Sequence, residues 1–196
     1  MVDLNRIDTR KLPLSYGTAR CRLALNDSRY TEDVVALRND PKLNRYIHHD
    51  PLTAEMHDQW LNAQLESRDS LNFAILVDGD FAGTVALYDI SPETAEYGRL
   101  VMREGQARAF APVAVLLFLS FGFEIVGLPE IHCRILEGNE RTVRFHDRMG
   151  WKRDPRYGGE ILFHGEKTRF VGFSISADEW PGIFEAHRDL LIQRLV

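Results

Sequence analysis

The stretch of sequence that decides the fold is residues 95–151, AEYGRLVMREGQARAFAPVAVLLFLSFGFEIVGLPEIHCRILEGNERTVRFHDRMGW. Residues 95–102 and 131–136 have the composition and alternation of β-strands, whereas residues 113–126 between them are almost unbroken hydrophobe. An apolar run of that length predicts a buried helix. The stretch therefore begins as a strand, a helix and a second strand.

A second helix is expected directly after the second strand. Asn139 is a good N-cap residue, and Gly150 is well placed to follow the last helical residue near Met149. Upstream, residues 72–77 and 81–90 read as antiparallel strands joined by an Asp-Gly turn. Together these elements predict a mixed α/β sheet in which one strand pair is parallel.

A polar loop is expected at residues 102–109, between the first strand and the long helix. The first amides of a helix lack an intrahelical acceptor and the helix dipole adds positive charge, so such a loop can bind an anion. Small residues alternate along it, which lets amides approach a phosphate, and Arg103 and Arg108 add positive charge. An ordinary strand-to-helix turn is the alternative.

Two motifs in this stretch, in this order and at this spacing, resemble the GNAT family, the Gcn5-related N-acetyltransferases. The first is Gln-x-x-small-x-small at residues 106–111, which is similar to the family's pyrophosphate-binding motif. The second is Asn-x-x-Thr-x-x-Phe-His-x-x-x-Gly-Trp at residues 139–151. Two positions depart from the family pattern: Ala109 stands where the first motif glycine is usual, and His146 where a proton-donating tyrosine is usual.

The resemblance implies a GNAT fold of class α/β, with a mixed, mostly antiparallel twisted sheet, a splayed central pair of parallel strands and flanking helices. It implies acetyl-CoA as the acyl donor, with the pantetheine arm in the gap between the splayed strands. A backbone amide near residues 100–102 would then polarise the thioester carbonyl. The residues expected to contact the donor are Leu100, Val101, Met102, Gln106, Ala107, Arg108, Ala109, Phe110, Ala111, Asn139, Arg141 and Phe145.

Two further stretches are similar to particular branches of the family. Residues 37–41 (LRNDP), followed by Tyr46 and residues 51–53, are similar to the N-terminal region of RimJ/RimL-like and PseH-like sugar-nucleotide acetyltransferases. Residues 173–180 (FSISADEW) resemble the last strand and its close in many RimJ/RimL-like members. The resemblance therefore suggests one of these two branches.

Attack of an amine on the thioester needs a group that removes a proton and a group that protonates the thiolate. Glu96 is the first candidate for the base, because strand alternation places it beside the gap and puts Tyr97 on the opposite face. Asp89 is the second candidate, and a chain of water molecules is a third possibility. His146 is the candidate acid, since an imidazole titrates near neutral pH. The alternatives are an exposed strand carboxylate at Glu96 and a surface or half-buried histidine at His146, since residues 144, 147 and 148 are polar.

Residues 32–39 are expected to form a helix, and Thr53 is expected to cap a second helix with apolar residues at helical spacing. The segment between these two helices is expected to form part of the acceptor site, and a solvated helix–helix connection is the alternative. The candidate acceptor-binding residues are Tyr46, His48, His49 and Tyr88. The PseH-like features favour an amino sugar on a nucleotide, whereas the RimJ/RimL-like ending favours a protein N-terminal amine. A small amine such as an antibiotic or a polyamine is a further alternative. Two adjacent histidines do not have metal-ligand spacing on one helix face, so no metal is expected.

The bulk composition limits the class of protein. With 196 residues, 44% hydrophobic and 27% charged, the chain suits a single domain over residues 1–196. Its net charge of −5 argues against a nucleic-acid partner. Cys21 and Cys133 lie in apolar context and are expected to be buried free thiols.

Targeting segments are not expected either. Residues 1–12 lack the apolar core of a signal peptide, and the apolar residues 113–126 are too short to span a bilayer. A cytoplasmic protein without a membrane partner is therefore expected, acting on a small-molecule or peptide amine as a monomer or homodimer. The alternative function is a catalytically degenerate GNAT domain, an acyl-CoA sensor or scaffold, because Ala109 departs from the motif.

Overall fold

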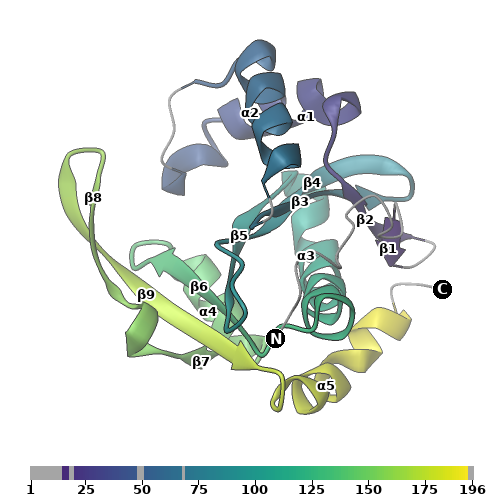
Figure 1. The fold of residues 1–196 in the computed structure, drawn as a ribbon, viewed down its shortest axis with the longest axis vertical. Coiled ribbons are helices and arrows are strands. Elements are labelled where there is room, and N and C mark those ends of the chain that lie inside the picture. Colours follow the sequence, from purple (N-terminus) through teal and green to yellow (C-terminus); the bar gives the residue numbers. More distant parts are fainter. Residues whose placement is uncertain (1–14, 18–19, 48–50, 68, 194–196) are drawn as a thin grey trace.

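The computed structural model describes residues 15–17, 20–47, 51–67 and 69–193, which form an α/β fold around one nine-stranded sheet (Figure 1). The strand order is β1-β2-β3-β4-β5-β6-β9-β7, with β8 beside β9, and only β5 and β6 pair in parallel among the described strands. This is the predicted fold class. The strands are β1 (Ser15–Gly17), β2 (Cys21–Leu25), β3 (Leu71–Val77), β4 (Asp80–Tyr88), β5 (Ala95–Met102), β6 (Glu130–Leu136), β7 (Lys152–Arg153), β8 (Gly159–Phe163) and β9 (Glu166–Ser176).

Helices cover both faces of the sheet. Figure 1 shows α1 and α2 side by side at one end of the molecule near β4, while α3 lies against the strands from the other side and α5 packs beside α3. The helices are α1 (Thr31–Asn39), α2 (Ala54–Glu66), α3 (Glu104–Ser120), α4 (Glu140–Arg148) and α5 (Trp180–Gln193). A π-helical segment, Phe121–Val126, continues α3.

The predicted helix signals act as expected at three positions. The Thr53 hydroxyl accepts a hydrogen bond from the Met56 amide (3.2 Å) and begins α2, and Asn139 Oδ1 accepts one from the Thr142 amide (3.3 Å) and begins α4. Gly150 follows α4 with a φ of 82°, a conformation that glycine adopts without strain. Local side-chain chemistry therefore sets these boundaries.

The start of the long helix differs from the prediction. The apolar pattern predicted a helix over residues 113–126, after Pro112, but α3 begins nine residues earlier at Glu104 and continues through that proline. Pro112 cannot donate to the carbonyl of Arg108, which is why a proline is usually taken as a helix start. Packing overrides that signal, because Val113 to Ser120 are all buried against the sheet.

This helix is also longer than its apolar run suggested. The combined segment Glu104–Val126 spans 23 residues and is, by length and composition, sufficient to cross a membrane. Two thirds of its most apolar window is buried inside the protein, as in the core helix of a soluble domain. The prediction that it is too short to span a bilayer was wrong, because the helix includes the polar residues before Pro112.

The parallel strands β5 and β6 separate after two residue pairs. They pair at Ala95 with Ile131 and at Glu96 with His132, although β5 continues to Met102 and β6 to Leu136. Beyond this point β5 pairs only with β4, and β6 only with β9. The predicted splay of the central strand pair is thus present.

A bulge lies in β5 just beyond the separation. Thr84 pairs with Val101 and Ala86 with Gly98, so Arg99 and Leu100 both face a single residue of β4. Arg99 has a φ of 54°, which is uncommon for a side chain other than glycine, and its carbonyl accepts a hydrogen bond from the Thr84 hydroxyl (2.9 Å). Bulges of this kind redirect side chains beside functional sites.

Candidate active site

Glu96 lies at the apex of the diverging strands, since it belongs to the last parallel pair. Its side chain is buried, and both carboxylate oxygens are occupied. Oε1 accepts hydrogen bonds from the Tyr88 hydroxyl (2.8 Å) and Arg134 Nε (3.1 Å), and Oε2 accepts one from Arg134 Nη2 (2.5 Å). His132 Nε2 lies 3.8 Å from Oε2. The carboxylate is therefore held in position by a forked guanidinium contact.

Tyr88 belongs to the same polar group. Burial, and then the negative charge of Glu96, raise the pKa of the Tyr88 phenol above its usual value. The hydroxyl consequently stays protonated and remains a donor. The structure brings together Tyr88 and Glu96, which were predicted to serve the acceptor and the proton transfer respectively.

Tyr97 points to the opposite face of the sheet, as strand alternation predicts. It is 3% exposed and packs against Phe118, His146 and Trp151, with ring centroids 5.4, 5.7 and 5.4 Å away. His146 is therefore a core residue on the α3 side of β5, not the half-buried surface histidine that its polar neighbours in sequence suggested.

The hydrogen-bond partner of His146 identifies which ring nitrogen carries the proton. Nδ1 lies 2.9 Å from the Thr142 carbonyl oxygen, which can only accept, so Nδ1 carries the proton. Burial lowers the pKa of His146 from 6.5 to about 4, so the ring is neutral at neutral pH. Nε2 is buried without a hydrogen-bond partner among the described residues. This geometry gives no direct support to His146 as a proton donor, and that role stays a prediction.

The predicted phosphate-binding loop is helical. Residues 106–111 lie in the first turns of α3, where the amides of Gln106 and Ala107 donate to the Arg103 carbonyl (3.0 Å each). The expectation that amides from Gln106 to Ala111 are open to a diphosphate was wrong. With alanine at positions 107 and 109, no residue needs a left-handed conformation, so the segment can join the helix. The amides left without a helical acceptor are those of Glu104 and Gly105.

The charges around this helix start also differ from expectation. Arg103 forms an ion pair with Asp33 of α1 and lies over the Phe81 ring, so its charge is already paired. Arg108 and Arg141 are exposed, and the Glu104 carboxylate lies in the first turn. The helix start therefore offers two amides and the exposed Arg108 guanidinium group beside one negative charge, whereas Arg141 lies on α4.

The other residues predicted to contact the donor occupy two environments. Val101 and Met102 are buried at the end of β5, and Leu100 is half-buried at the bulge. Phe110 and Phe145 pack against the main core, as do Ala107 and Ala111, whereas Asn139 acts as the N-cap of α4.

The predicted acceptor wall is described only in part. Tyr46 lies in a 3-10 turn, Asn44–Tyr46, and its hydroxyl donates to the Gly138 carbonyl (2.8 Å), just beyond the end of β6. This contact ties the segment between α1 and α2 to the far side of the strand separation. His48 and His49 lie outside the described residues.

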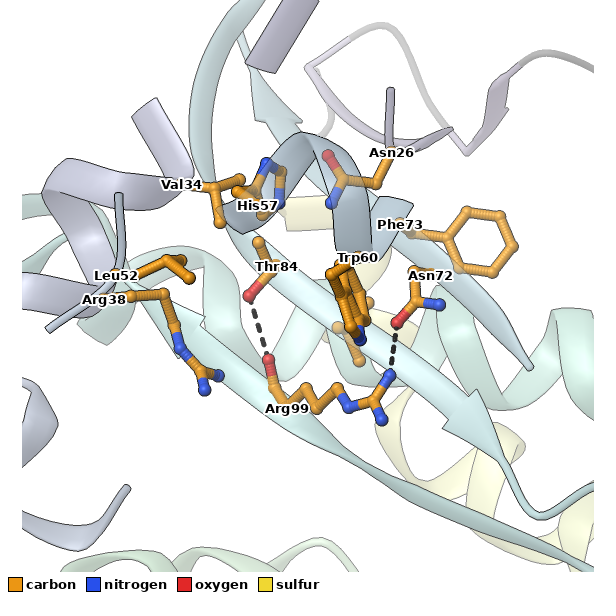
Figure 2. A pocket seen from close by; sticks show the side chains of 11 residues that line it. Asn26, Val34, Arg38, Leu52, His57, Trp60, Asn72, Phe73, Thr84 and Arg99 are labelled. Atoms are coloured by element: carbon orange, nitrogen blue, oxygen red, sulfur yellow. Dashed lines mark hydrogen bonds between the residues drawn. The ribbon is translucent and has the colours of Figure 1, made fainter. Parts of the chain in front are cut away.

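A cavity of about 250 Å³ lies between α1, α2 and strands β3 to β5 (Figure 2). Its polar lining comes from residues that are far apart in sequence. Those that matter most are Arg38, His57, Trp60, Asn72, Thr84 and Arg99. Sequence reasoning missed Arg38, His57 and Trp60, which lie on two helices whose spacing indicated only packing.

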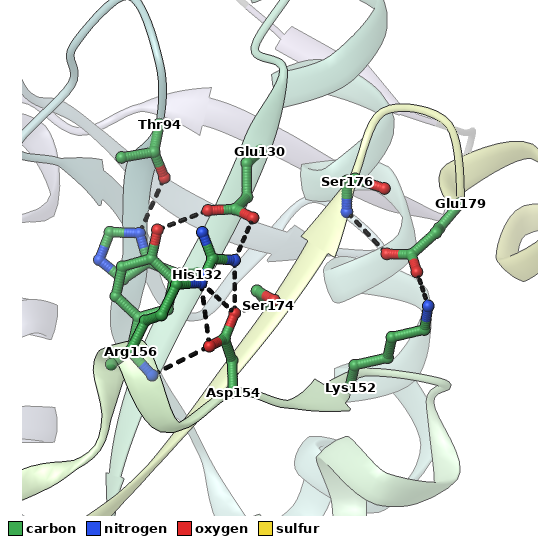
Figure 3. A network of polar contacts seen from close by, with 10 residues as sticks. Thr94, Glu130, His132, Lys152, Asp154, Arg156, Ser174, Ser176 and Glu179 are labelled. Atoms are coloured by element: carbon green, nitrogen blue, oxygen red, sulfur yellow. Dashed lines mark hydrogen bonds and ion pairs between the residues drawn. The ribbon is translucent and has the colours of Figure 1, made fainter.

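A second polar network lies around Glu130 and His132, at the start of β6 (Figure 3). Arg156 bridges Asp154 (2.5 Å) and Glu130 (2.7 Å), and the Tyr157 ring stacks on His132 with centroids 3.8 Å apart. Beside it, Lys152 forms an ion pair with Glu179. These contacts fix the segment after α4 against β6 and β9, and so hold His132 in place near Glu96.

The structure also places the two cysteines. Cys21 and Cys133 are buried free cysteines, as predicted. Over the ranges that the structure describes, no cluster of three or more histidine, cysteine or acidic residues could hold a metal ion.

A sheet with a splayed parallel pair, a long helix directly after the first of these strands and a capped helix after the second define an acyltransferase fold of the GNAT type. Residues 22–152 match the family model described as the acetyltransferase (GNAT) domain. The chain therefore belongs to the GNAT acetyltransferase family.

Individual relatives are distant. An uncharacterized N-acetyltransferase derived from the SPbeta prophage of Bacillus subtilis (strain 168) is 21% identical over 154 residues, which are 76% of this chain and 87% of the relative. The structure of FdhC, a nucleotide-linked sugar GNAT, is 21% identical with a TM-score of 0.76, covering 92% of this chain and 99% of that chain. Spermidine N-acetyltransferase from Vibrio cholerae, in complex with CoA and spermine, is 16% identical with a TM-score of 0.73, covering 83% and 99%. These structures share the fold.

Proposed function

We propose that this protein is an N-acetyltransferase that moves an acetyl group from acetyl-CoA to a primary amine by direct attack. The observation that carries the proposal is the separation of β5 from β6 after Glu96, in a chain of the GNAT family. Strand edges that separate leave backbone groups of Leu100 to Met102 for a pantetheine arm, which is itself an amide chain. The related spermidine acetyltransferase was solved with CoA, which supports the same donor here.

In this reaction the amine nitrogen attacks the thioester carbonyl carbon, the new C–N bond forms and the C–S bond breaks. The thiolate of CoA leaves and takes up a proton, while the amine loses one. A β5 amide near Leu100 would stabilise the negative charge that develops on the carbonyl oxygen. The diphosphate of the donor would lie at the start of α3, beside Arg108 and the Glu104 and Gly105 amides.

Glu96 is our candidate for the group that receives the proton of the amine. It lies at the apex of the splay, and its bonds to Tyr88 and Arg134 fix its position. Because the carboxylate is already engaged, we propose that the proton reaches it through the Tyr88 hydroxyl or an intervening water molecule. His146 remains the candidate acid by position in the motif alone.

The acceptor is a primary amine, and the branches of the family differ in which amine they use. FdhC acts within the class of nucleotide-linked sugar enzymes, and the Vibrio cholerae enzyme acts on spermidine. An amino sugar on a nucleotide fits the cavity lined by Trp60 and two arginines better than a polyamine or a protein N-terminus does. We therefore favour the sugar-nucleotide branch over the RimJ/RimL-like branch.

A second candidate function is an acyl-CoA sensor or scaffold without transfer activity. The helical conformation of residues 106–111 favours it, since this leaves fewer amides for a diphosphate than the predicted loop would. The two functions share the donor but differ in turnover.

Two measurements test the proposed function. Acetyl-CoA should raise the melting temperature, because a ligand that binds only the folded state stabilises it by mass action. Incubation with acetyl-CoA and a panel of primary amines should release free CoA thiol in proportion to acetylated product. A thermal shift without transfer would support the sensor, and the absence of both would overturn the proposal.

A further inference from the structure

Arg99 is half-buried, whereas three exposed arginines of the described chain are paired with carboxylates. Arg134 is paired with Glu96, Arg153 with Asp147 and Arg156 with Asp154. Arg99 instead donates from Nη1 to the amide oxygen of Asn72 (2.8 Å), and it forms no ion pair with a described residue. A guanidinium group has five N–H donors, so most of those on Arg99 have no acceptor among the described residues.

Aromatic rings hold this guanidinium in place. Its carbon lies 4.6 Å from the centroid of the Tyr88 ring and 5.2 Å from that of Trp60, so two rings pack against it while Asn72 fixes one nitrogen. Figure 2 shows the side chain extended beneath Trp60 along the cavity. Rings that pack on a guanidinium plane leave its edge open, and that edge binds carboxylate or phosphate through two parallel hydrogen bonds.

The rest of the lining adds positive charge. Arg38 of α1 lines the same cavity, and burial, followed by the charge of Arg99, lowers the pKa of Arg38. None of the described lining residues is acidic. Two described carboxylates interact electrostatically with Arg99: Glu96, which pairs with Arg134, and Asp89, which is exposed and does not line the cavity. An anion in the cavity would offset the positive charge of the Arg99 guanidinium group.

The cavity adjoins the proposed reaction centre. Arg99 is part of the β5 bulge, directly before the strand residues that would face the donor, and Tyr88 connects it to Glu96. A molecule that fills the cavity can therefore place an amine near the thioester. Its volume of about 250 Å³ is below the usual range for drug-sized ligands, so it suits one sugar- or amino-acid-sized part of an acceptor.

We propose that this cavity is an oxyanion subsite, in which Arg99 binds a phosphate or carboxylate group carried by the acceptor amine and Arg38 adds positive charge to the lining. The inference rests on the proposed function for the amine, but the subsite is a binding site in its own right. It assigns the acceptor to amines that carry a negative group, and it excludes polyamines, whose charge would meet two guanidinium groups.

Binding without the donor tests the subsite directly. The probes are matched pairs with the same amine: glucosamine 6-phosphate with glucosamine, and β-alanine with β-alaninamide, together with spermidine. We expect the melting temperature to rise with at least one anionic member at concentrations where its neutral partner and spermidine cause no shift. The two pairs distinguish a phosphate subsite from a carboxylate subsite.

The variants Arg99→Gln and Arg99→Lys show whether the guanidinium group is responsible. Arg99→Gln should weaken binding of the anionic probe by about 10- to 100-fold, as expected for lost charge-assisted hydrogen bonds, and Arg99→Lys should restore only part of it. Arg188→Gln is the matched control, since Arg188 is an exposed arginine on α5 and should leave binding unchanged. Melting temperatures without ligand check that each variant is folded.

Three results would overturn the subsite: an equal or larger shift with the neutral probes or spermidine, an anionic shift that survives Arg99→Gln, or no shift with any probe at millimolar concentration. Transfer assays separate this failure from failure of the proposed function. Acetylation of neutral amines without anion preference would retain the acetyltransferase and remove the subsite. Anion binding without any acetyl transfer would retain the subsite and remove the acetyltransferase.

Discussion

The two faces of β5 differ in polarity. On one face Tyr97 is buried and packs against Phe118, His146 and Trp151. On the other, the adjacent residue Glu96 meets only polar partners. Successive side chains of a strand point to opposite faces, so one peptide unit separates core from candidate chemistry.

The comparison shows how the fold divides its tasks. The α3 face is packed with aromatic and aliphatic side chains, which stabilise the sheet by burial. The α1 and α2 face carries the cavity and the arginine side chains, where Trp60 and Arg99 pack more loosely. Substitutions on the first face should therefore change stability, and those on the second should change transfer.

Glu96→Gln should have the largest effect. The substitution keeps the shape of the side chain and its hydrogen bond from Tyr88, but it removes the charge that would accept the proton of the amine. We expect kcat to fall about 10²- to 10⁴-fold with little change in acetyl-CoA affinity, the range usual for loss of a general base. Transfer kinetics under saturating acetyl-CoA measure it.

Glu185→Gln on α5 is the control, because Glu185 is exposed and pairs only with Arg188 among the described residues. A kcat for Glu96→Gln within threefold of the unmodified protein would remove Glu96 from proton transfer and leave a water chain in its place.

Phe118→Ala should have the next largest effect, and on stability alone. Phe118 is completely buried and packs against Phe73 and Tyr97, so its truncation should lower the free energy of unfolding by about 3–5 kcal/mol. Trp60→Ala, on the other face, should lower it by less and raise the KM for the acceptor instead. Urea unfolding and transfer kinetics measure both variants. A larger loss of stability in Trp60→Ala, together with a raised acceptor KM in Phe118→Ala, would contradict the division between faces.

His146 gives the third prediction, a dependence of stability on pH. Its folded pKa of about 4 lies below its usual value of 6.5, so between these pH values the unfolded chain binds a proton that the folded chain does not. Its contribution to stability is therefore lost as the pH falls from 6.5 towards 4, by roughly 3 kcal/mol in total. In His146→Leu the free energy of unfolding should vary less over this range.

Parallel slopes of unfolding free energy for His146→Leu and the unmodified protein would contradict the buried neutral ring. The same variant tests the acid role at neutral pH. A kcat reduced tenfold or more at unchanged acetyl-CoA affinity would support His146 as the acid, whereas an unchanged kcat assigns it to the core.

Glu104→Gln should have the smallest effect. Its carboxylate lies in the first turn of α3, where the proposed diphosphate would also lie, so the two negative charges would repel. We expect acetyl-CoA to bind about two- to fivefold more tightly to the variant, while the helix loses a few tenths of a kcal/mol. Calorimetric titration at low salt measures the affinity, and weaker binding would place the diphosphate elsewhere.

The sequence predicted the strands and caps well because their signals are local. Asp78-Gly79, Thr53 and Asn139 each act through their own backbone or the next turn, and the structure has a turn or helix start at each. The splayed strand pair followed from the family resemblance, not from any local pattern.

The sequence could not predict what depends on tertiary packing. The apolar run suggested a helix from residue 113, but the buried residues after Pro112 stabilise a helix that extends on both sides of the proline. Polar neighbours made His146 look partly exposed, although helix geometry turns it inward. Arg38, His57 and Trp60 meet at one cavity only because α1 and α2 fold over the β5 bulge.

The most direct measurement is a crystal structure with CoA bound. We predict the pantetheine arm between β5 and β6, hydrogen-bonded to the backbone of Leu100 to Met102, with the diphosphate at the start of α3 and the sulfur directed towards the Glu96 face. CoA bound elsewhere, or β5 and β6 paired along their whole length around it, would contradict a donor site formed by the separation of these strands.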